Sequence, residues 1–100
     1  MKYDKLIRDN VPEIIKAKGG NPVTRIAADA EYWEKLTDKL REEVAEFLHD
    51  DKVEELADIL EVVEAICAYK NVAFAEVMAM KEKKATERGT FSKRLILEEA

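Results

Sequence analysis

Hydrophobic residues recur every three to four positions along most of the 100-residue chain, a spacing typical of helices that bury one side. The pattern predicts an all-α bundle of about four helices, over residues 11–18, 30–48, 52–69 and 73–88. Pro12 suits the first turn of the first helix, and Gly89 follows the last residue of the fourth. Residues 23–27 are too few and too β-branched for a good helix, so we expect them to pair with 92–97 in a short two-stranded ribbon.

The helix expected over 52–69 is apolar around more than half of its circumference, from Tyr69 and Val62 round to Leu60 and Val53. Packing within a helical hairpin requires a narrower stripe. We therefore expect this helix at the centre of the fold, with an additional role at a subunit interface. The chain is expected to form one domain, residues 1–100, at the small end of the size range, where oligomers commonly supply extra burial. An obligate oligomer is predicted.

Two acidic pairs of the same design lie on the second and third expected helices. Glu43 and Glu46 form the first pair, and Glu55 and Asp58 form the second, each at i, i+3 spacing. This spacing puts both carboxylates of a pair on one side of a helix, a turn apart. Residues 49–51 are the only polar break between the pairs, so the two helices are expected to fold back antiparallel and to bring the four carboxylates together.

The acidic pairs also fall close to the apolar stripes. At about 100° per residue, Glu43 lies on the edge of the buried side of its helix, and Glu46 follows just outside it. Glu55 falls inside the apolar stripe of the next helix, with Asp58 at the margin. Burying a carboxylate is costly, and neighbouring carboxylates repel each other. A hard divalent cation, which prefers oxygen ligands, would compensate both effects.

The side of the last helix that begins with Phe74 and Val77 becomes cationic toward its end. The cations in that direction are Lys81, Lys84 and Arg88. Cations are favoured in the last turn of any helix, which accounts for part of this pattern. A polyphosphate bound near the four carboxylates would also explain why a core-facing direction turns cationic. Arg8, just before the first helix, is a further cation that the helix dipole does not favour.

The composition narrows the class of protein. With a net charge of −5, the chain lacks the basic character of proteins that bind nucleic acid polymers, although a metal would still allow it to bind a small polyanion. The single Cys67 lies on an apolar stripe and is expected to be a core thiol in a reducing cytoplasm. His49, in the polar break, is expected to be solvated or to cap a helix. No segment has the length needed to cross a bilayer, and no signal peptide is recognisable at the start, so no membrane association is expected.

The acidic motifs have a recognisable form. Residues 42–46 read EEVAE and residues 55–58 read ELAD, which match the EExxE and ExxD signature of MazG-type, all-α nucleoside triphosphate pyrophosphatases, with a spacer at or slightly below the short end of that family's range. The opening KLIRD at 5–9 and the closing RGTFSKR at 88–94 resemble a small single-domain branch of house-cleaning pyrophosphatases, related also to phosphoribosyl-ATP pyrophosphohydrolases. The resemblance covers nearly the whole chain.

This resemblance implies a helical bundle, a homodimer or a dimer of dimers, that uses Mg²⁺, with Mn²⁺ as a possible substitute. The implied reaction cleaves the α–β phosphoanhydride of a nucleoside triphosphate to give a monophosphate and pyrophosphate. The implied metal ligands are Glu43, Glu46, Glu55 and Asp58. Glu46 is also the candidate to accept the proton of the attacking water. The implied phosphate-binding residues are Lys84 and Arg88, which match the family's spacing, with Lys81 and Arg8 as further candidates.

Two other functions fit the same residues. Hydrolysis of phosphoribosyl-ATP uses a similar acidic core. A helical dimerisation or regulatory module without catalytic activity would carry the acidic pairs only as solubilising charge, and Glu55 would then be dispensable.

Overall fold

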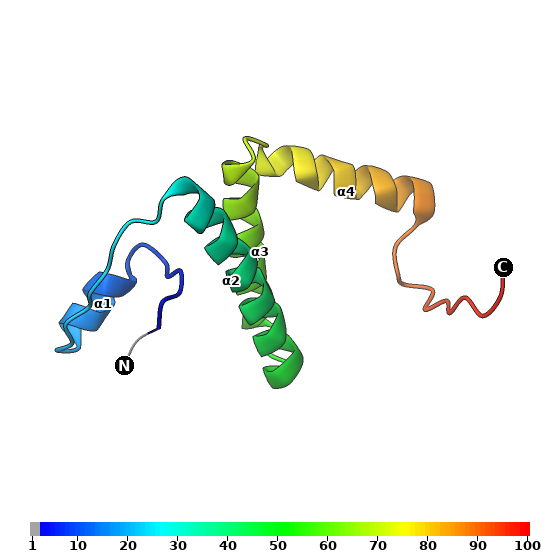
Figure 1. Ribbon diagram of the computed structural model, residues 1–100. Coiled ribbons are helices and arrows are strands. Elements are labelled where there is room, and N and C mark those ends of the chain that lie inside the picture. Colours follow the sequence, from blue (N-terminus) through cyan, green and yellow to red (C-terminus); the bar gives the residue numbers. More distant parts are fainter. Residues whose placement is uncertain (1–2) are drawn as a thin grey trace.

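Residues 3–100 are described in a computed structural model, and this part of the chain contains four helices and no strand. The helices are α1 (Val11–Ala17), α2 (Asp29–Asp50), α3 (Glu54–Tyr69) and α4 (Phe74–Arg88) (Figure 1). The predicted all-helical fold is confirmed, with bounds within two residues of those expected. The second helix continues through the polar residues 49–50 and ends at Asp50, and the next residue, Asp51, has a left-handed conformation (φ 54°). None of the helices in residues 3–100 combines the length and apolar character needed to cross a membrane.

The helices α2 and α3 form an antiparallel hairpin, which is the best-packed part of the molecule (Figure 1). Leu36 of α2 is only 1% exposed, and Val62 and Cys67 of α3 are also buried. Cys67 is a free thiol within this core, as predicted. The tight turn at 51–53 joins the helices, so that residues near the end of α2 lie beside those near the start of α3.

An aromatic cluster fixes the other end of the hairpin. The rings of Trp33 and Tyr69 are stacked, with centroids 5.1 Å apart, and Tyr32 meets Tyr69 edge-on at 5.9 Å. The hydroxyl of Tyr69 donates a hydrogen bond to Asp29 over 3.2 Å, and the ammonium of Lys70 lies 4.6 Å from the Trp33 ring centroid. These contacts hold the start of α2 against the end of α3.

The helix α4 leaves the hairpin after the turn at 70–73 and extends away from it (Figure 1). In the described part of the chain α4 packs only against α3, and none of its residues is buried. Residues 89–100 continue without helix or strand, and Phe91 is 97% exposed. The radius of gyration is 17.6 Å, whereas a compact chain of this length has about 13 Å. The single chain is therefore more extended than a compact domain of the same length.

The two segments expected to form a ribbon do not pair in residues 3–100. Residues 23–27 follow α1 on one side of the hairpin, and residues 92–97 follow α4 on the other (Figure 1). Arg25 of the first segment forms an ion pair with Glu31 at the start of α2 instead. Residues 92–93 lie in a turn, in which the Arg94 N–H donates a hydrogen bond to the Phe91 carbonyl, and Arg94 has a left-handed φ of 59°. The divergence of α1 and α4 keeps the two segments apart (Figure 1).

Candidate functional site

Two carboxylates are buried between the helices of the hairpin. Glu43 of α2 is 7% exposed and Glu55 of α3 is 6% exposed. One oxygen of each, Oε2 of Glu43 and Oε1 of Glu55, has no hydrogen-bond partner in the described residues. Since native proteins pair nearly all their buried polar atoms, two such oxygens on adjacent helices indicate that the hairpin is built to contact a further polar or charged group.

A third predicted site residue, Glu46, lies on the exposed side of the same acidic cluster. The negative charge of Glu43 raises the pKa of Glu46, and burial and the charge of Glu42 act in the same direction. Burial raises the pKa of Glu55, and the neighbouring carboxyl of Asp50 and the charge of Glu46 add to this shift. The carboxylates at the end of α2 and the start of α3 are thus close enough to disfavour one another's ionisation.

Asp50 was not anticipated as a member of this cluster. It lies at the end of α2, where its Oδ1 is 2.7 Å from Nδ1 of the His49 ring. The hydrogen bond from His49 lowers the pKa of Asp50, and the adjacent Glu55 carboxyl contributes to the same shift. The ring of His49 itself is exposed, as predicted.

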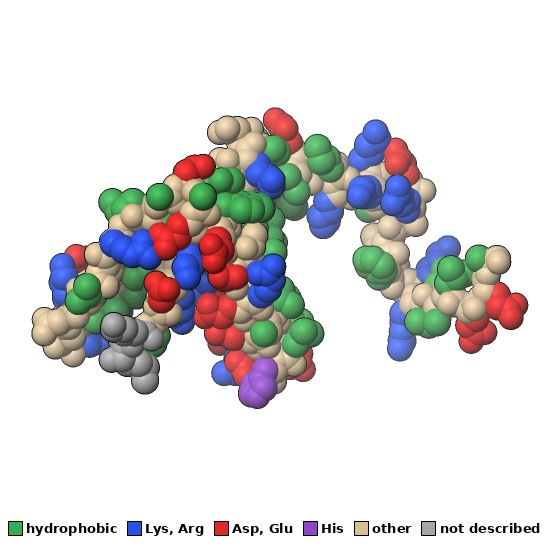
Figure 2. All heavy atoms as spheres, in the orientation of Figure 1, with side chains coloured by type: hydrophobic (Ala, Val, Ile, Leu, Met, Phe, Trp, Pro, Cys, Tyr) green, Lys and Arg blue, Asp and Glu red, His purple; other side chains and the backbone are tan. Residues whose placement is uncertain are grey.

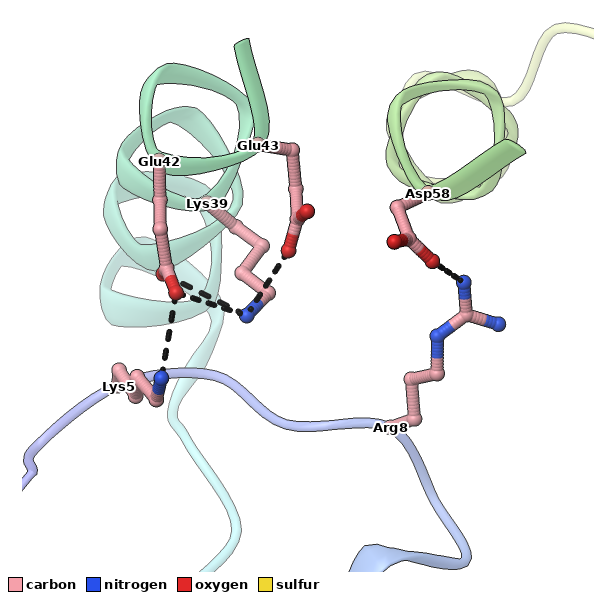
Figure 3. Close-up of polar contacts among 6 residues, drawn as sticks. All are labelled: Lys5, Arg8, Lys39, Glu42, Glu43 and Asp58. Atoms are coloured by element: carbon pink, nitrogen blue, oxygen red, sulfur yellow. Dashed lines mark hydrogen bonds and ion pairs between the residues drawn. The ribbon is translucent and has the colours of Figure 1, made fainter. Parts of the chain in front are cut away.

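The fourth predicted ligand, Asp58, forms an ion pair. The guanidinium of Arg8 donates a hydrogen bond to Oδ1 of Asp58 over 2.8 Å (Figure 3). Its other terminal nitrogen lies 3.7 Å from Oε1 of Glu61. Arg8 comes from the segment before α1, so this contact brings the start of the chain against α3. The two predicted site residues Arg8 and Asp58 are therefore direct partners.

Lys39 is a central residue of the site that the sequence patterns did not single out. Its ammonium lies 3.3 Å from Glu43 Oε1 and 3.4 Å from both oxygens of Glu42, while Lys5 reaches Glu42 Oε1 at 3.2 Å (Figure 3). Burial alone raises the pKa of Glu42, but these two ammonium groups outweigh it and lower the pKa. The spacing of Lys39 four residues before Glu43 is the signal that would have identified it.

The carboxylates have the right chemistry for a hard divalent cation but do not converge as a ligand set. No three His, Cys, Asp or Glu side chains within residues 3–100 are arranged so that they could hold a metal ion. The side chains of Glu43 and Asp58 instead approach Lys39 and Arg8, respectively (Figure 3). The unpartnered oxygens of Glu43 and Glu55 suit a cation that prefers oxygen ligands, and binding one requires side-chain rotations.

The single chain does not bring the predicted cations of α4 to this cluster. Lys81, Lys84 and Arg88 are exposed, and Lys81 pairs with Glu82 of its own helix at 3.1 Å. Figure 2 shows basic side chains gathered over α4, away from the acidic side chains of the hairpin. The acidic residues of the predicted site therefore lie on the hairpin, and its predicted cations on α4 lie elsewhere in the chain.

A groove of about 700 Å³ adjoins the acidic cluster. It lies between residues 6–14, α2 and α3, and both Glu43 and Asp58 line it. Arg8 and Lys39 line it as well, so its charged end contains both ion pairs described above.

Comparisons with known proteins add one partial match. The chain is 55% identical over 42 residues to an uncharacterized protein of Mycolicibacterium smegmatis, and the match spans 42% of this chain and 43% of that protein. The aligned part is thus less than half of either chain. No protein-family model matches the chain, and no solved structure matches it.

Proposed function

We propose that the protein is a Mg²⁺-dependent nucleoside triphosphate pyrophosphohydrolase that cleaves the α–β phosphoanhydride to give a nucleoside monophosphate and pyrophosphate. The observation that carries the proposal is the pair of buried carboxylates, Glu43 and Glu55, each with an unpartnered oxygen, on adjacent helices. The resemblance of the surrounding motifs to MazG-type pyrophosphatases supports the same reaction.

The residues that would hold the metal are Glu43, Glu46, Glu55 and Asp58, with Mn²⁺ as a possible substitute for Mg²⁺. When bound, the metal neutralises phosphate charge and lowers the pKa of a coordinated water. Release of Arg8 from Asp58 and of Lys39 from Glu43 would free both carboxylates as ligands. The two cations would then be available to form charge-assisted hydrogen bonds with phosphate oxygens.

Glu46 is the proposed proton acceptor for the attacking water. Its carboxylate is exposed to solvent, unlike that of Glu43 or Glu55. The raised pKa of Glu46 makes its ionised form a stronger base, which favours proton transfer near neutral pH.

The proposed assembly is a homodimer or a dimer of dimers, in the cytoplasm, where the free thiol of Cys67 is stable. The face of α3 that α2 leaves uncovered carries exposed Leu56 and Leu60, and α4 has no buried residue of its own. A second copy of the chain would cover these apolar groups. It would also supply the cationic side of α4 to the carboxylates of the first copy.

The decisive test is the variant Glu55→Gln, compared with Glu54→Gln on the exposed side of the same helix. Mg²⁺ at millimolar concentration should raise the melting temperature of the wild type, because a ligand that binds only the folded state stabilises it. A panel of nucleoside triphosphates and phosphoribosyl-ATP, with pyrophosphate and orthophosphate measured separately, should reveal pyrophosphate release.

Glu55→Gln is expected to fold, to lose the response to Mg²⁺ and to lose pyrophosphate release by more than about 100-fold, a larger effect than loss of a residue that only supports a ligand. Glu54→Gln should behave as the wild type. Full Mg²⁺-dependent release of pyrophosphate by Glu55→Gln would rule out the assignment of metal ligands.

A further inference from the structure

The groove beside the acidic cluster changes from charged to apolar along its length. Its volume of about 700 Å³ lies within the range of roughly 300–1,000 Å³ that is usual for small-molecule sites. On α3 its wall runs from Asp58 through Val62 to Ala65 and Ala68. These positions follow one face of the helix over about 15 Å, at a rise of about 1.5 Å per residue.

The wall formed by α2 changes in the same direction, because the two helices are antiparallel. Glu43 and Lys39 line the groove beside Asp58, and Leu36 and Tyr32 line it toward the end of α3. On α2 the charged residues of the groove thus lie at one end and the apolar residues at the other, whereas on α3 Glu61 and Glu64 extend the acidic surface as far as Ala65 and only Ala68 lies beyond them. The elongated site fits a ligand that is itself charged at one end and uncharged at the other.

The apolar end contains an aromatic ring that is already fixed in place. Tyr32 lines the groove and packs edge-on against Tyr69, which is stacked on Trp33 and bonded to Asp29. A ring held in this way loses little freedom when a ligand stacks on it. The small side chain of Ala68 on α3 also lines this part of the groove and occupies little of its width.

Residues 6–14 form the third wall and add hydrogen-bonding capacity. Val11 and Ile14 contribute apolar surface, and Asn10 contributes an amide. The Asn10 side chain makes no capping hydrogen bond to α1, so both its donor and its acceptor are available to a ligand. An amide of this kind suits the polar edge of a planar heterocycle.

We infer that this groove binds the nucleoside part of the substrate, with the base between Tyr32 and residues 10–14 and the phosphates at Glu43 and Asp58. The inference rests on the proposed function, and it extends that function from the acidic motifs to a recognition site for the base. Glu61 and Glu64 also line the groove and give it an acidic majority. A free anion is therefore repelled, and an uncharged nucleoside is the part of a nucleotide that the apolar end accepts.

The test separates recognition of the base from recognition of the phosphates. The probes are the α,β-methylene analogues of the common nucleoside triphosphates, which resist hydrolysis at the α–β bridge, and inorganic tripolyphosphate, all with Mg²⁺ and measured by calorimetry. The variant Ala68→Trp fills the apolar end at an exposed position, and Ala65→Leu does so with a smaller side chain should the first variant not fold. Ala79→Trp on the exposed side of α4 is the matched control.

The wild type should bind at least one analogue more tightly than tripolyphosphate by roughly 5- to 150-fold, the range expected when one base stacks on an aromatic ring. Ala68→Trp should abolish this difference while keeping the affinity for tripolyphosphate, and Ala79→Trp should keep both. An analogue that never exceeds tripolyphosphate, or a preference that survives both groove variants, overturns the inference and leaves the proposed function standing. Failure of every probe to bind the wild type overturns both.

Discussion

The hairpin of α2 and α3 and the region formed by α4 with residues 89–100 differ in how completely a single chain buries their hydrophobic side chains. The hairpin buries Leu36 almost completely, and its aromatic cluster closes the end opposite the turn. The α4 region buries no side chain of its helix and ends in exposed hydrophobic residues, of which Phe91 is the largest. The hairpin therefore has its packing partners within the chain, whereas in residues 3–100 α4 packs only against α3.

The same two regions divide the charged groups of the candidate site. The hairpin holds the buried carboxylates, and α4 carries a cationic side that meets none of them within the chain. An acidic cluster with unpartnered oxygens and a helix whose cations have anionic partners only within the same helix are complementary. This difference is the reason for proposing that a second copy of the chain supplies the cationic side of α4.

The largest expected effect is complementation between two inactive chains. One chain carries Glu55→Gln and the other carries Lys81→Ala, Lys84→Ala and Arg88→Ala together. Glu55→Gln alone should lose pyrophosphate release by more than about 100-fold. The triple variant alone should lose it by roughly 10³-fold or more, the size of effect seen when a cation that clamps phosphates is removed. After the two chains are unfolded together and refolded, activity should return to about a quarter of the wild-type value, since half of symmetric dimers are mixed and each mixed dimer has one intact site.

The control for this experiment is Lys83→Ala, which removes a cation from another side of α4 and should leave activity unchanged. If the mixture stays as inactive as its components while the wild type is active, then acidic and cationic residues act within one chain. The α4 region would then have to fold back onto its own hairpin.

The second prediction concerns stability and compares a residue of each region. Leu36→Ala leaves a cavity in the hairpin and should lower the free energy of unfolding by about 2–5 kcal/mol. Met80→Ala, on the exposed surface of α4, should change it by less than about 0.5 kcal/mol. Urea denaturation of both variants and the wild type measures the difference. Equal losses at the two positions would show that α4 is packed as tightly as the hairpin.

The features that the sequence predicts well are those with a local cause. Apolar spacing defined the four helices, and the direction of Glu55 within the stripe of α3 identified it as a buried carboxylate. The end of α2 was set two residues too early, because polar residues at 49–50 interrupt the apolar pattern without ending the helix. Helical spacing predicts which side of a helix is buried, so it also predicts which carboxylates lie on that side.

The features that it does not predict depend on contacts between distant segments. The ion pair of Arg8 with Asp58 joins residues 50 positions apart, and no periodic pattern encodes it. The course of α4 away from the hairpin depends on how the turn at 70–73 is oriented, which the apolar positions of α4 do not specify. The expected ribbon is absent from residues 3–100 for the same reason, since strand pairing requires two segments that are distant in the sequence to meet.

The smallest expected effect is a dependence of stability on pH that arises from the hairpin carboxylates. The pKa values of Glu46 and Glu55 are raised above their ordinary value of 4.5 in the folded protein, by the charge of Glu43 and by burial, respectively. Protons therefore bind the folded state more tightly than the unfolded state. Their stabilisation is complete below the ordinary value and is lost as the pH rises through the raised values.

Without Mg²⁺, the melting temperature should thus increase modestly as the pH is lowered from neutral toward 4.5, and the stabilisation by Mg²⁺ should shrink over the same range because the metal must displace these protons. The pKa of His49 is also raised, by Asp50, but this effect lies above 6.5 and is removed by measuring in a His49→Gln background. In that background, the double variant Glu46→Gln and Glu55→Gln should flatten the profile. A profile that keeps its slope in the double variant would assign the pH dependence to groups outside the acidic cluster, and it would remove the electrostatic reason for choosing Glu46 as the proton acceptor.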